Sequence, residues 1–89
     1  MSFQKTLKAL SDPTRRKIMD LLKEGNLTAG EITEQFSISG ASISHHLSIL
    51  KDANLVLDEK KGKYIYYEIN ATVLDEVIAW FQELRNDNE

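Results

Sequence analysis

Two adjacent histidines, His45 and His46, are the side chains of this sequence with the widest chemistry, and both lie in the segment SISHHLSIL at residues 42–50. Imidazole binds metals, transfers protons and makes hydrogen bonds to polar surfaces. The 89-residue chain contains no other histidine and no cysteine. What the pair can do therefore depends on the element that carries it.

The spacing of apolar residues around the pair predicts a helix. At about 100° per residue, the spacing i, i+3, i+4, i+7 forms one stripe. Residues on this stripe are Ile43, His46, Leu47 and Leu50. The opposite side carries Ala41, Ser44, His45 and Ser48, with Gly40 and Lys51 at its edge. We expect His46 to flank the core as a partly buried residue making one hydrogen bond, and His45 to face outward.

The outward side of this helix favours contact with another surface. Gly, Ala and Ser side chains let a helix axis come close, and hydroxyl and imidazole groups then reach base edges or phosphates in a major groove. The alternative is an ordinary solvated face. Such faces usually carry Glu and Lys, and this one has few of either.

Metal binding and catalysis are both disfavoured. Two zinc-binding histidines on one helix require spacing i, i+4, whereas adjacent ones diverge. Ser42, Ser44 and Ser48 lie near the histidines, but the turns of a single helix do not build a triad with an orienting carboxylate. We therefore expect no enzyme activity, no cofactor and no metal.

Composition fits one small domain spanning residues 1–89. The hydrophobic share is 42%, enough for a core, although so short a chain buries little apolar area and a second copy could add to it. The lack of cysteine, of a signal-peptide pattern and of any long apolar run leads us to expect a cytoplasmic protein without membrane insertion.

The net charge of −3 hides an uneven distribution. Residues 1–23 carry six basic and two acidic side chains, whereas residues 64–89 carry six acidic side chains and one arginine. A cluster of three lysines lies between them, at positions 60, 61 and 63. Because local fields decide what a surface attracts, the pattern is compatible with one face on DNA and another turned away from it.

Capping signals divide the first half of the chain into four helices. Asp12 with Pro13 starts the second helix, and Gly25 can end it. Thr28 and Glu31 match a capping box that starts the third, with Ile32 and Phe36 inward. Ser39 starts the fourth helix, which runs to about Ala53, and Asn54 tolerates the left-handed conformation that follows. The first helix, expected over residues 2–10, has Phe3, Leu7 and Leu10 on one face.

The pattern changes from Leu55 onward. Alternating segments at residues 55–59 and 64–69 predict two strands joined by Lys60-Lys61-Gly62-Lys63, a hairpin with a basic tip. Asn70 is expected to cap a last helix over residues 71–86. Its apolar residues are Val73, Leu74, Val77, Ile78, Trp80, Phe81 and Leu84. The predicted fold is mainly α with a β-hairpin: a winged helix-turn-helix, with the helix-turn-helix at 28–53 and the wing at 55–69.

Three stretches of the sequence resemble the ArsR/SmtB family of bacterial winged-helix repressors over roughly residues 5–80. They are LSDPTRRKIMDLL, TAGEITEQFSISGASISHHLSILKDANLV and KKGKYIYYEI. The family's motifs occur in order: D-P-T-R-R, then S-x-H-L-x-x-L, then K-G-K-x-x-Y-Y. Within the family the sequence is similar to the SdpR-like branch of autorepressors.

The resemblance implies a homodimer that binds operator DNA and represses transcription, with the fourth helix in the major groove and the wing on the adjoining backbone. The implied dimer contacts come from the first and last helices: Phe3, Leu7, Val77, Trp80, Phe81 and Leu84. The implied DNA contacts are Thr28, Ser39, Gly40, Ala41, Ser42, Ser44, His45, Ser48, Lys60, Lys61 and Lys63.

Some features depart from the metal-sensing members of the family or stay open. Such members hold thiolates in the third helix or His/Asp pairs in the last, and this chain has neither. An effector, if present, could be a regulatory protein or a small molecule. Arg15 and Arg16 could hold phosphates or pair with Asp12, Asp20 or Glu24, and we favour the pairing. A winged helix used only for protein docking is the main rival function.

Overall fold

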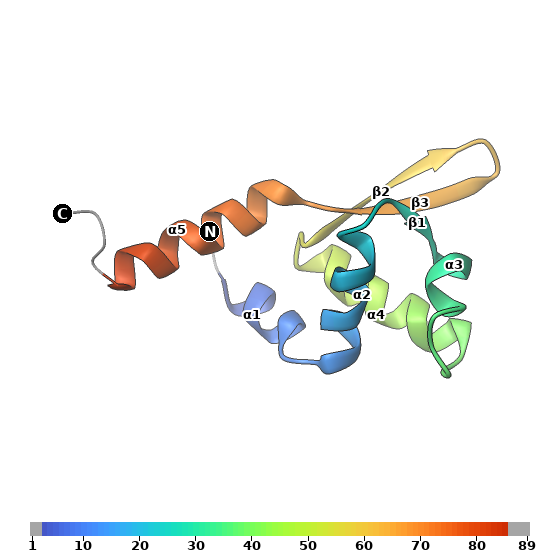
Figure 1. Ribbon diagram of the computed structural model, residues 1–89, viewed down its shortest axis with the longest axis horizontal. Helices are drawn as coiled ribbons and strands as arrows, with labels where there is room; N and C mark the ends of the chain where they lie inside the picture. Colours follow the sequence, from blue (N-terminus) through green and yellow to red (C-terminus); the bar gives the residue numbers. More distant parts are fainter. Residues whose placement is uncertain (1–2, 86–89) are drawn as a thin grey trace.

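The computed structural model describes residues 3–85, which form five helices and three strands. In chain order these are α1 (Gln4–Leu10), α2 (Pro13–Leu22), β1 (Leu27–Thr28), α3 (Ala29–Thr33), α4 (Gly40–Asp52), β2 (Val56–Lys61), β3 (Tyr64–Ile69) and α5 (Ala71–Arg85). Helices α1 to α4 form the body, while the β2–β3 wing and α5 extend from it in opposite directions (Figure 1). Ser2 and Asn86, the expected outer ends of the terminal helices, lie outside the described residues.

Helix α4 is the centre of the core, because its predicted apolar stripe is fully buried. Ile43, Leu47 and Leu50 are each at most 1% exposed. They pack with residues from α2, α3, the first residue of β2 and the residue before it: Ile18, Leu22, Ile32, Val56 and Leu55. Each such side chain contributes about 1.5–3 kcal/mol on burial. The core therefore fixes which side of α4 faces outward.

The predicted caps of α2, α3 and α4 are confirmed. The Asp12 carboxylate accepts from the Arg15 amide at 3.0 Å, and the Thr28 hydroxyl accepts from the Glu31 amide at 3.1 Å. In the reciprocal bond of the capping box, the Glu31 carboxylate accepts from the Thr28 amide at 2.9 Å. Ser39 caps α4. These bonds satisfy amides that would otherwise lack partners and fix where α2, α3 and α4 begin.

The sheet differs from the predicted hairpin in two ways. Strand β1 was not predicted, and it pairs antiparallel with β3 to give the order β1-β3-β2. The loop of the wing is also shorter than expected, because β2 continues through Lys60 and Lys61. Lys61 pairs with Tyr64, which leaves a two-residue loop of Gly62 and Lys63. Gly62 has a φ of 64°, as the tight turn requires.

Two predicted helix details are also corrected, in α1 and α3. In α1 the buried residues are Thr6 and Ala9, whereas Leu7 is 40% exposed. Helix α3 ends at Thr33, so Phe36, though it packs on the core, lies in the bend that follows. Asn70 donates its side-chain amide to the Asn54 carbonyl at 2.9 Å, which ties the start of α5 to the end of α4.

Candidate nucleic-acid interface

The outward side of α4 is an exposed surface of small and hydroxyl-bearing residues. Every predicted contact residue on the helix and its cap is exposed: Ser39, Gly40, Ala41, Ser42, Ser44, His45 and Ser48. The acidic residue on this helix, Asp52, lies at its C-terminal end and pairs with Lys5 at 3.1 Å. The helix can therefore come close to a polyanion without direct repulsion from its first three turns.

The N-terminal end of α4 offers amide donors to an anion. Ser39 accepts from the Ser42 amide at 3.1 Å, and its hydroxyl lies 3.2 Å from that of Ser42. The remaining first-turn amides have no helical partner and carry the positive end of the helix dipole. Thr28 is placed less favourably, because it is half-buried and its hydroxyl is already used in the capping box beside the Glu31 carboxylate.

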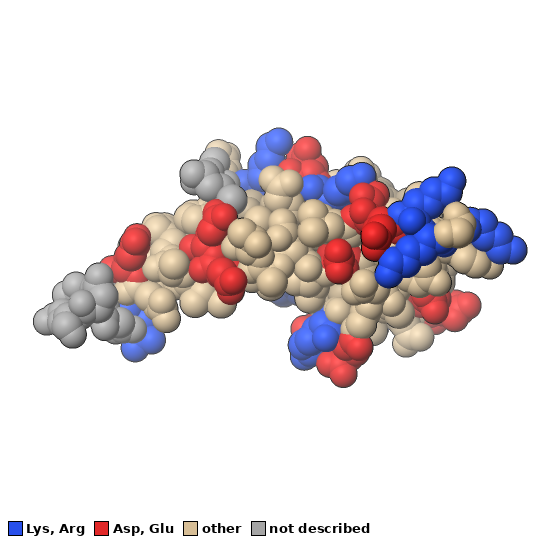
Figure 2. All heavy atoms as spheres, turned by 90° about the horizontal axis from the view of Figure 1, so that it is seen from above, with Lys and Arg blue, Asp and Glu red and all other residues tan. Residues whose placement is uncertain are grey.

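The wing presents its three lysines in different directions. Side chains alternate across a strand, so Lys60 and Lys61 lie on opposite faces, and Lys63 is in the turn. Lys61 lies 3.6 Å from the Glu59 carboxylate, while Lys63 lies 5.5 Å from the ring of Tyr64. All three lysines are exposed. Figure 2 shows the resulting blue cluster at one end of the molecule.

The link between α4 and the wing is an ion pair. Lys51, in the last turn of α4, donates to the Asp58 carboxylate at 2.8 Å. This hydrogen bond raises the pKa of Lys51 above its ordinary value. Since both groups are at the surface, the pair adds little stability, but it connects α4 to the strand that carries Lys60 and Lys61.

His46 is half-buried, as predicted, and its partner is Arg15. The Arg15 Nη1 atom lies 3.1 Å from His46 Nδ1. The Asp12 carboxylate lies 4.0 Å from the same nitrogen. His45 is exposed on the other side of the helix, with its ring centre 6.0 Å from that of His46. The two histidines thus diverge, as the helical spacing predicted.

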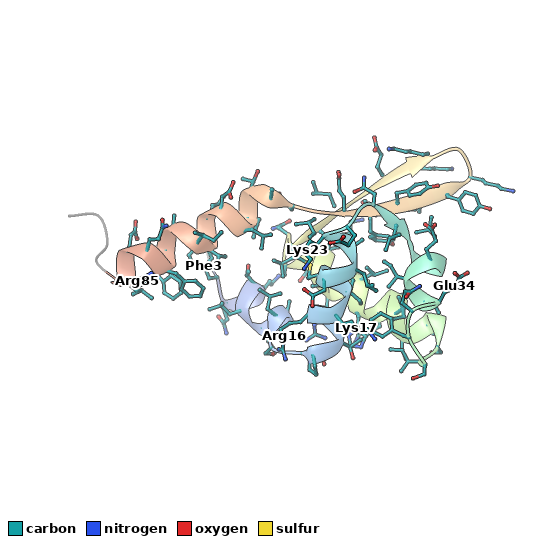
Figure 3. All side chains as sticks on the ribbon, viewed as in Figure 1. Phe3, Arg16, Lys17, Lys23, Glu34 and Arg85 are labelled. Atoms are coloured by element: carbon teal, nitrogen blue, oxygen red, sulfur yellow. The ribbon has the colours of Figure 1, made fainter. Side chains whose placement is uncertain are left out.

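Arg15 and Arg16 make hydrogen bonds within the chain, but with backbone carbonyls rather than with the predicted Asp20 and Glu24. Arg15 Nε donates to the Ala9 carbonyl at 2.7 Å, and Arg16 donates to the Leu10 carbonyl at 2.8 Å. Arg16 lies at the corner between α1 and α2 (Figure 3). Both arginines therefore satisfy the carbonyls left free at the end of α1. Asp12 does lie close enough to Arg15 to be influenced by its charge.

Most of the predicted dimer residues form an apolar surface on α1 and α5, but Val77 is only 7% exposed and is buried within the single chain instead. The Phe3 ring centre lies 5.4 Å from that of Trp80 in a tilted arrangement, and the Trp80 ring lies 5.4 Å from that of Phe81. Phe3 reaches from the start of α1 to α5 (Figure 3). Of the last helix, Val73 and Val77 are buried within the chain. Large apolar side chains left exposed on these two helices are Leu7 (40%), Ile78 (53%), Phe81 (47%) and Leu84 (64%).

Two further features of residues 3–85 bear on other functions. Within residues 3–85, no three His, Cys, Asp or Glu side chains come together in a way that could hold a metal ion. In the same part of the chain, no helix has the length and apolar character needed to cross a bilayer.

A helix-turn-helix with an exposed small-residue face, followed by a basic β-hairpin, defines a winged helix-turn-helix domain. Residues 12–57 match the model of the arsR family of bacterial regulatory proteins. The chain belongs to this family.

Individual relatives agree with the family model. The chain is 56% identical over 82 residues to the transcriptional repressor SdpR of Bacillus subtilis (strain 168), covering 92% of this chain and 91% of that one. It is 37% identical over 83 residues to an arsenical resistance operon repressor of Staphylococcus aureus, covering 93% and 80%. These relatives are transcriptional regulators, a class without enzyme activity, in agreement with the sequence prediction.

Solved structures confirm the predicted fold class. An ArsR-like transcriptional regulator from Rhodococcus sp. RHA1 superposes with a TM-score of 0.86 at 25% identity, covering 93% of this chain and 78% of that one. The homodimeric winged helix-turn-helix DNA-binding domain of a Mycobacterium bovis protein superposes with a TM-score of 0.75 at 26% identity, covering 94% and 78%.

Proposed function

We propose that this ArsR-family repressor binds an inverted-repeat operator as a homodimer and blocks transcription by occupying the promoter. The observation that carries the proposal is the two-sided character of α4. Its apolar side is fully buried, and its opposite side is small, polar and exposed. Such a helix can lie in a major groove about 12 Å wide. Since transcription takes place on the chromosome, the protein would act in the cytoplasm.

Base and backbone contacts would come from different elements. The exposed side of α4, with Ser44, His45 and Ser48, is the surface whose hydrogen-bonding groups could read base edges. The wing lysines Lys60, Lys61 and Lys63 have flexible ammonium groups that neutralise phosphate without a fixed geometry. The ion pair between Lys51 and Asp58 supports joint use of the two elements, because it links them directly.

The dimer is supported by the apolar surface of α1 and α5. Phe81 and Leu84 are 47% and 64% exposed in the single chain, and contiguous apolar surface of this kind is typical of an interface between proteins. The Mycobacterium bovis relative is a homodimer. A two-fold axis relating the two protomers would place the α4 helix of each protomer on one of two successive half-sites.

We further propose that the repressor does not respond to metals. The chain has no thiolate to offer and its two histidines diverge. Adding zinc, cadmium or nickel, or a chelator, should leave operator affinity within about twofold, well below the roughly 5–150-fold of typical allosteric coupling. A reproducible tenfold loss on adding any of these ions would instead favour a carboxylate site.

The proposal is tested by footprinting the purified protein on the DNA upstream of its own gene. The expected result is protection of an inverted repeat whose half-sites are spaced by about one helical turn or a multiple of it. The rival function, a docking module for another protein, predicts no protected repeat. It also predicts the same weak, salt-sensitive affinity for every duplex.

A further inference from the structure

Arg15 connects three elements through one guanidinium group. Its Nε donates to the Ala9 carbonyl in the last turn of α1 at 2.7 Å, and its Nη1 lies 3.1 Å from His46 Nδ1 in the middle of α4. Its own backbone amide is held by the Asp12 carboxylate at 3.0 Å, at the start of α2. The half-buried side of α4 is thus tied to α1 through the Arg15 side chain, in addition to the ion pair between Lys5 and Asp52.

The contact between Arg15 and His46 fixes the protonation of the imidazole. A guanidinium group only donates hydrogen bonds, because it stays charged at every relevant pH. His46 Nδ1 must therefore accept, so the ring is neutral and carries its proton on Nε2 while this bond exists. A second proton, on Nδ1, would remove the acceptor and place two positive groups 3.1 Å apart.

We propose that Arg15 is a positioning residue for DNA recognition, which sets the orientation of α4 relative to α1 by donating to neutral His46, and that protonation of His46 releases it. This inference rests on the proposed function, because α4 is the helix proposed to read DNA and α1 one of the helices proposed to form the dimer. In the released state, His46 would turn its new N–H toward the Asp12 carboxylate, which is 4.0 Å away.

The surroundings of His46 favour two alternative arrangements. At the start of α2, the Arg15 guanidinium disfavours a positive charge on His46, whereas the nearby Asp12 carboxylate favours one. On α4 itself, the neighbouring His45 ring centre is 6.0 Å from that of His46. On the α1 side, Lys5 and Lys8 line a groove with Arg15. Lys5 is already paired with Asp52, and no ion pair of Lys8 is found within residues 3–85.

The same groove gives Arg15 space to move. It lies between α1 and the second half of α4, has a volume of about 330 Å³, and has Ala9, Ile49 and Ala53 among its lining residues. A guanidinium released from His46 can therefore stay attached to the Ala9 carbonyl and turn into this groove. The change requires no unfolding of either helix.

The test compares pH profiles of operator binding in variants of His46. All variants carry His45→Gln, because protonation of an exposed histidine on the DNA side would by itself strengthen binding to phosphate. His46→Asn keeps an oxygen acceptor near the position of Nδ1 but cannot be protonated. His46→Leu removes the acceptor, and Arg15→Lys keeps the charge but loses the forked geometry that reaches two partners at once.

The parent protein, which carries His45→Gln alone, should lose operator affinity about 5- to 10-fold between about pH 8 and about pH 5.5, the range in which histidines change charge. His46→Asn should bind like the parent at the higher pH and vary at least threefold less across the range. His46→Leu and Arg15→Lys should bind weakly at both ends, with circular dichroism showing them folded. An equal pH dependence in the parent and in His46→Asn would overturn the proposal.

A second measurement needs no DNA and separates this inference from the proposed function. NMR of the imidazole nitrogens in the free wild-type protein should show His46 with its proton on Nε2 at about pH 8. It should also show the amide signals of Ser44 and His45 shifting with its protonation. A proton on Nδ1 of His46 at that pH would overturn the proposed hydrogen bond from Arg15 to His46, whether or not the protein binds any duplex.

Discussion

Ser44 and His45 are the side chains whose loss should change sequence recognition without changing the fold. Both are exposed on α4 and neither contributes to the core. Replacing either by alanine should cost roughly 1–3 kcal/mol on the operator if it reads a base, whereas binding to a scrambled duplex should hardly change. Binding curves on both duplexes at several salt concentrations measure the difference. Thr72→Ala, which removes an exposed hydroxyl from α5, is the matched control and should affect neither.

Asp12 should make the stability of the fold depend on pH. The hydrogen bond from the Arg15 amide, together with the nearby Arg15 charge, lowers the pKa of Asp12 below its ordinary value of 3.8. Because the folded-state pKa is the lower one, the stabilisation is fully present above the unfolded-state pKa. It is lost as the pH falls through the folded-state pKa.

The corresponding measurement is urea denaturation at about pH 7 and about pH 3. Asp12→Ala should lower the free energy of unfolding by about 0.5–2 kcal/mol at the higher pH, the usual cost of losing a cap. Asp12→Asn keeps a capping oxygen and should lose mainly the pH dependence. If Asp12→Asn and Asp12→Ala are equally destabilised at both pH values, the charge on Asp12 does not contribute.

Among single residues, the sequence predicts those whose role follows from a local pattern. Thr28 and Glu31 form the expected capping box, and His45 and His46 diverge as helical spacing requires. The carbonyl partners of Arg15 and Arg16 could not be predicted, because a backbone carbonyl leaves no signal in a sequence. An arginine shortly after a helix C-terminus, with few acidic neighbours, is the weak indication that was available.

Among the elements, the wing carries a prediction that separates two kinds of contact. Replacing Lys61 or Lys63 by glutamine should weaken binding to operator and scrambled DNA alike. Each change should lower the slope of log affinity against log salt by about one unit. Lys23→Gln removes the same charge at an exposed position outside the wing and the helix-turn-helix, and should leave the slope unchanged. Loss of operator binding alone in the wing variants would mean that the lysines read bases.

A substitution of Glu59, also in the wing, should have the opposite effect on DNA affinity. Its carboxylate lies 3.6 Å from the Lys61 ammonium, so Lys61 must give up this partner to contact phosphate. Glu59→Gln should therefore increase affinity for both duplexes and leave the salt slope the same or slightly steeper. A decrease in affinity would show that Glu59 is needed to orient Lys61.

The extents of the elements were predicted less well than their order. All five helices and the hairpin are where periodicity and caps placed them. Strand β1 was missed because two residues, Leu27 and Thr28, are too few for an alternating pattern to be recognised. The wing tip was misjudged because strand length depends on pairing with β3, and the charged residues Lys60 and Lys61 have low strand propensity.

At the scale of the whole molecule, the shape separates the two proposed interfaces. The described residues extend 49 × 26 × 21 Å, with the wing at one end of the long axis and α5 at the other (Figure 1). In Figure 2 the basic cluster lies at the wing end and acidic side chains follow α5. A dimer built on α1 and α5 would leave both wings free and keep the acidic helices away from DNA phosphate.

The last prediction concerns that dimer. Phe81 and Leu84 are already 47% and 64% exposed in the single chain, so a charge placed there is not forced into the core of one protomer. Leu84→Glu should therefore convert a dimer into a folded monomer, with operator affinity reduced because only one half-site is contacted. Gln82→Glu adds the same charge at an exposed position on the opposite side of α5 and should remain dimeric. Sedimentation velocity at micromolar concentration, with circular dichroism to verify folding, distinguishes the two. A folded wild-type monomer under these conditions would exclude the dimer and with it the inverted-repeat mode of binding.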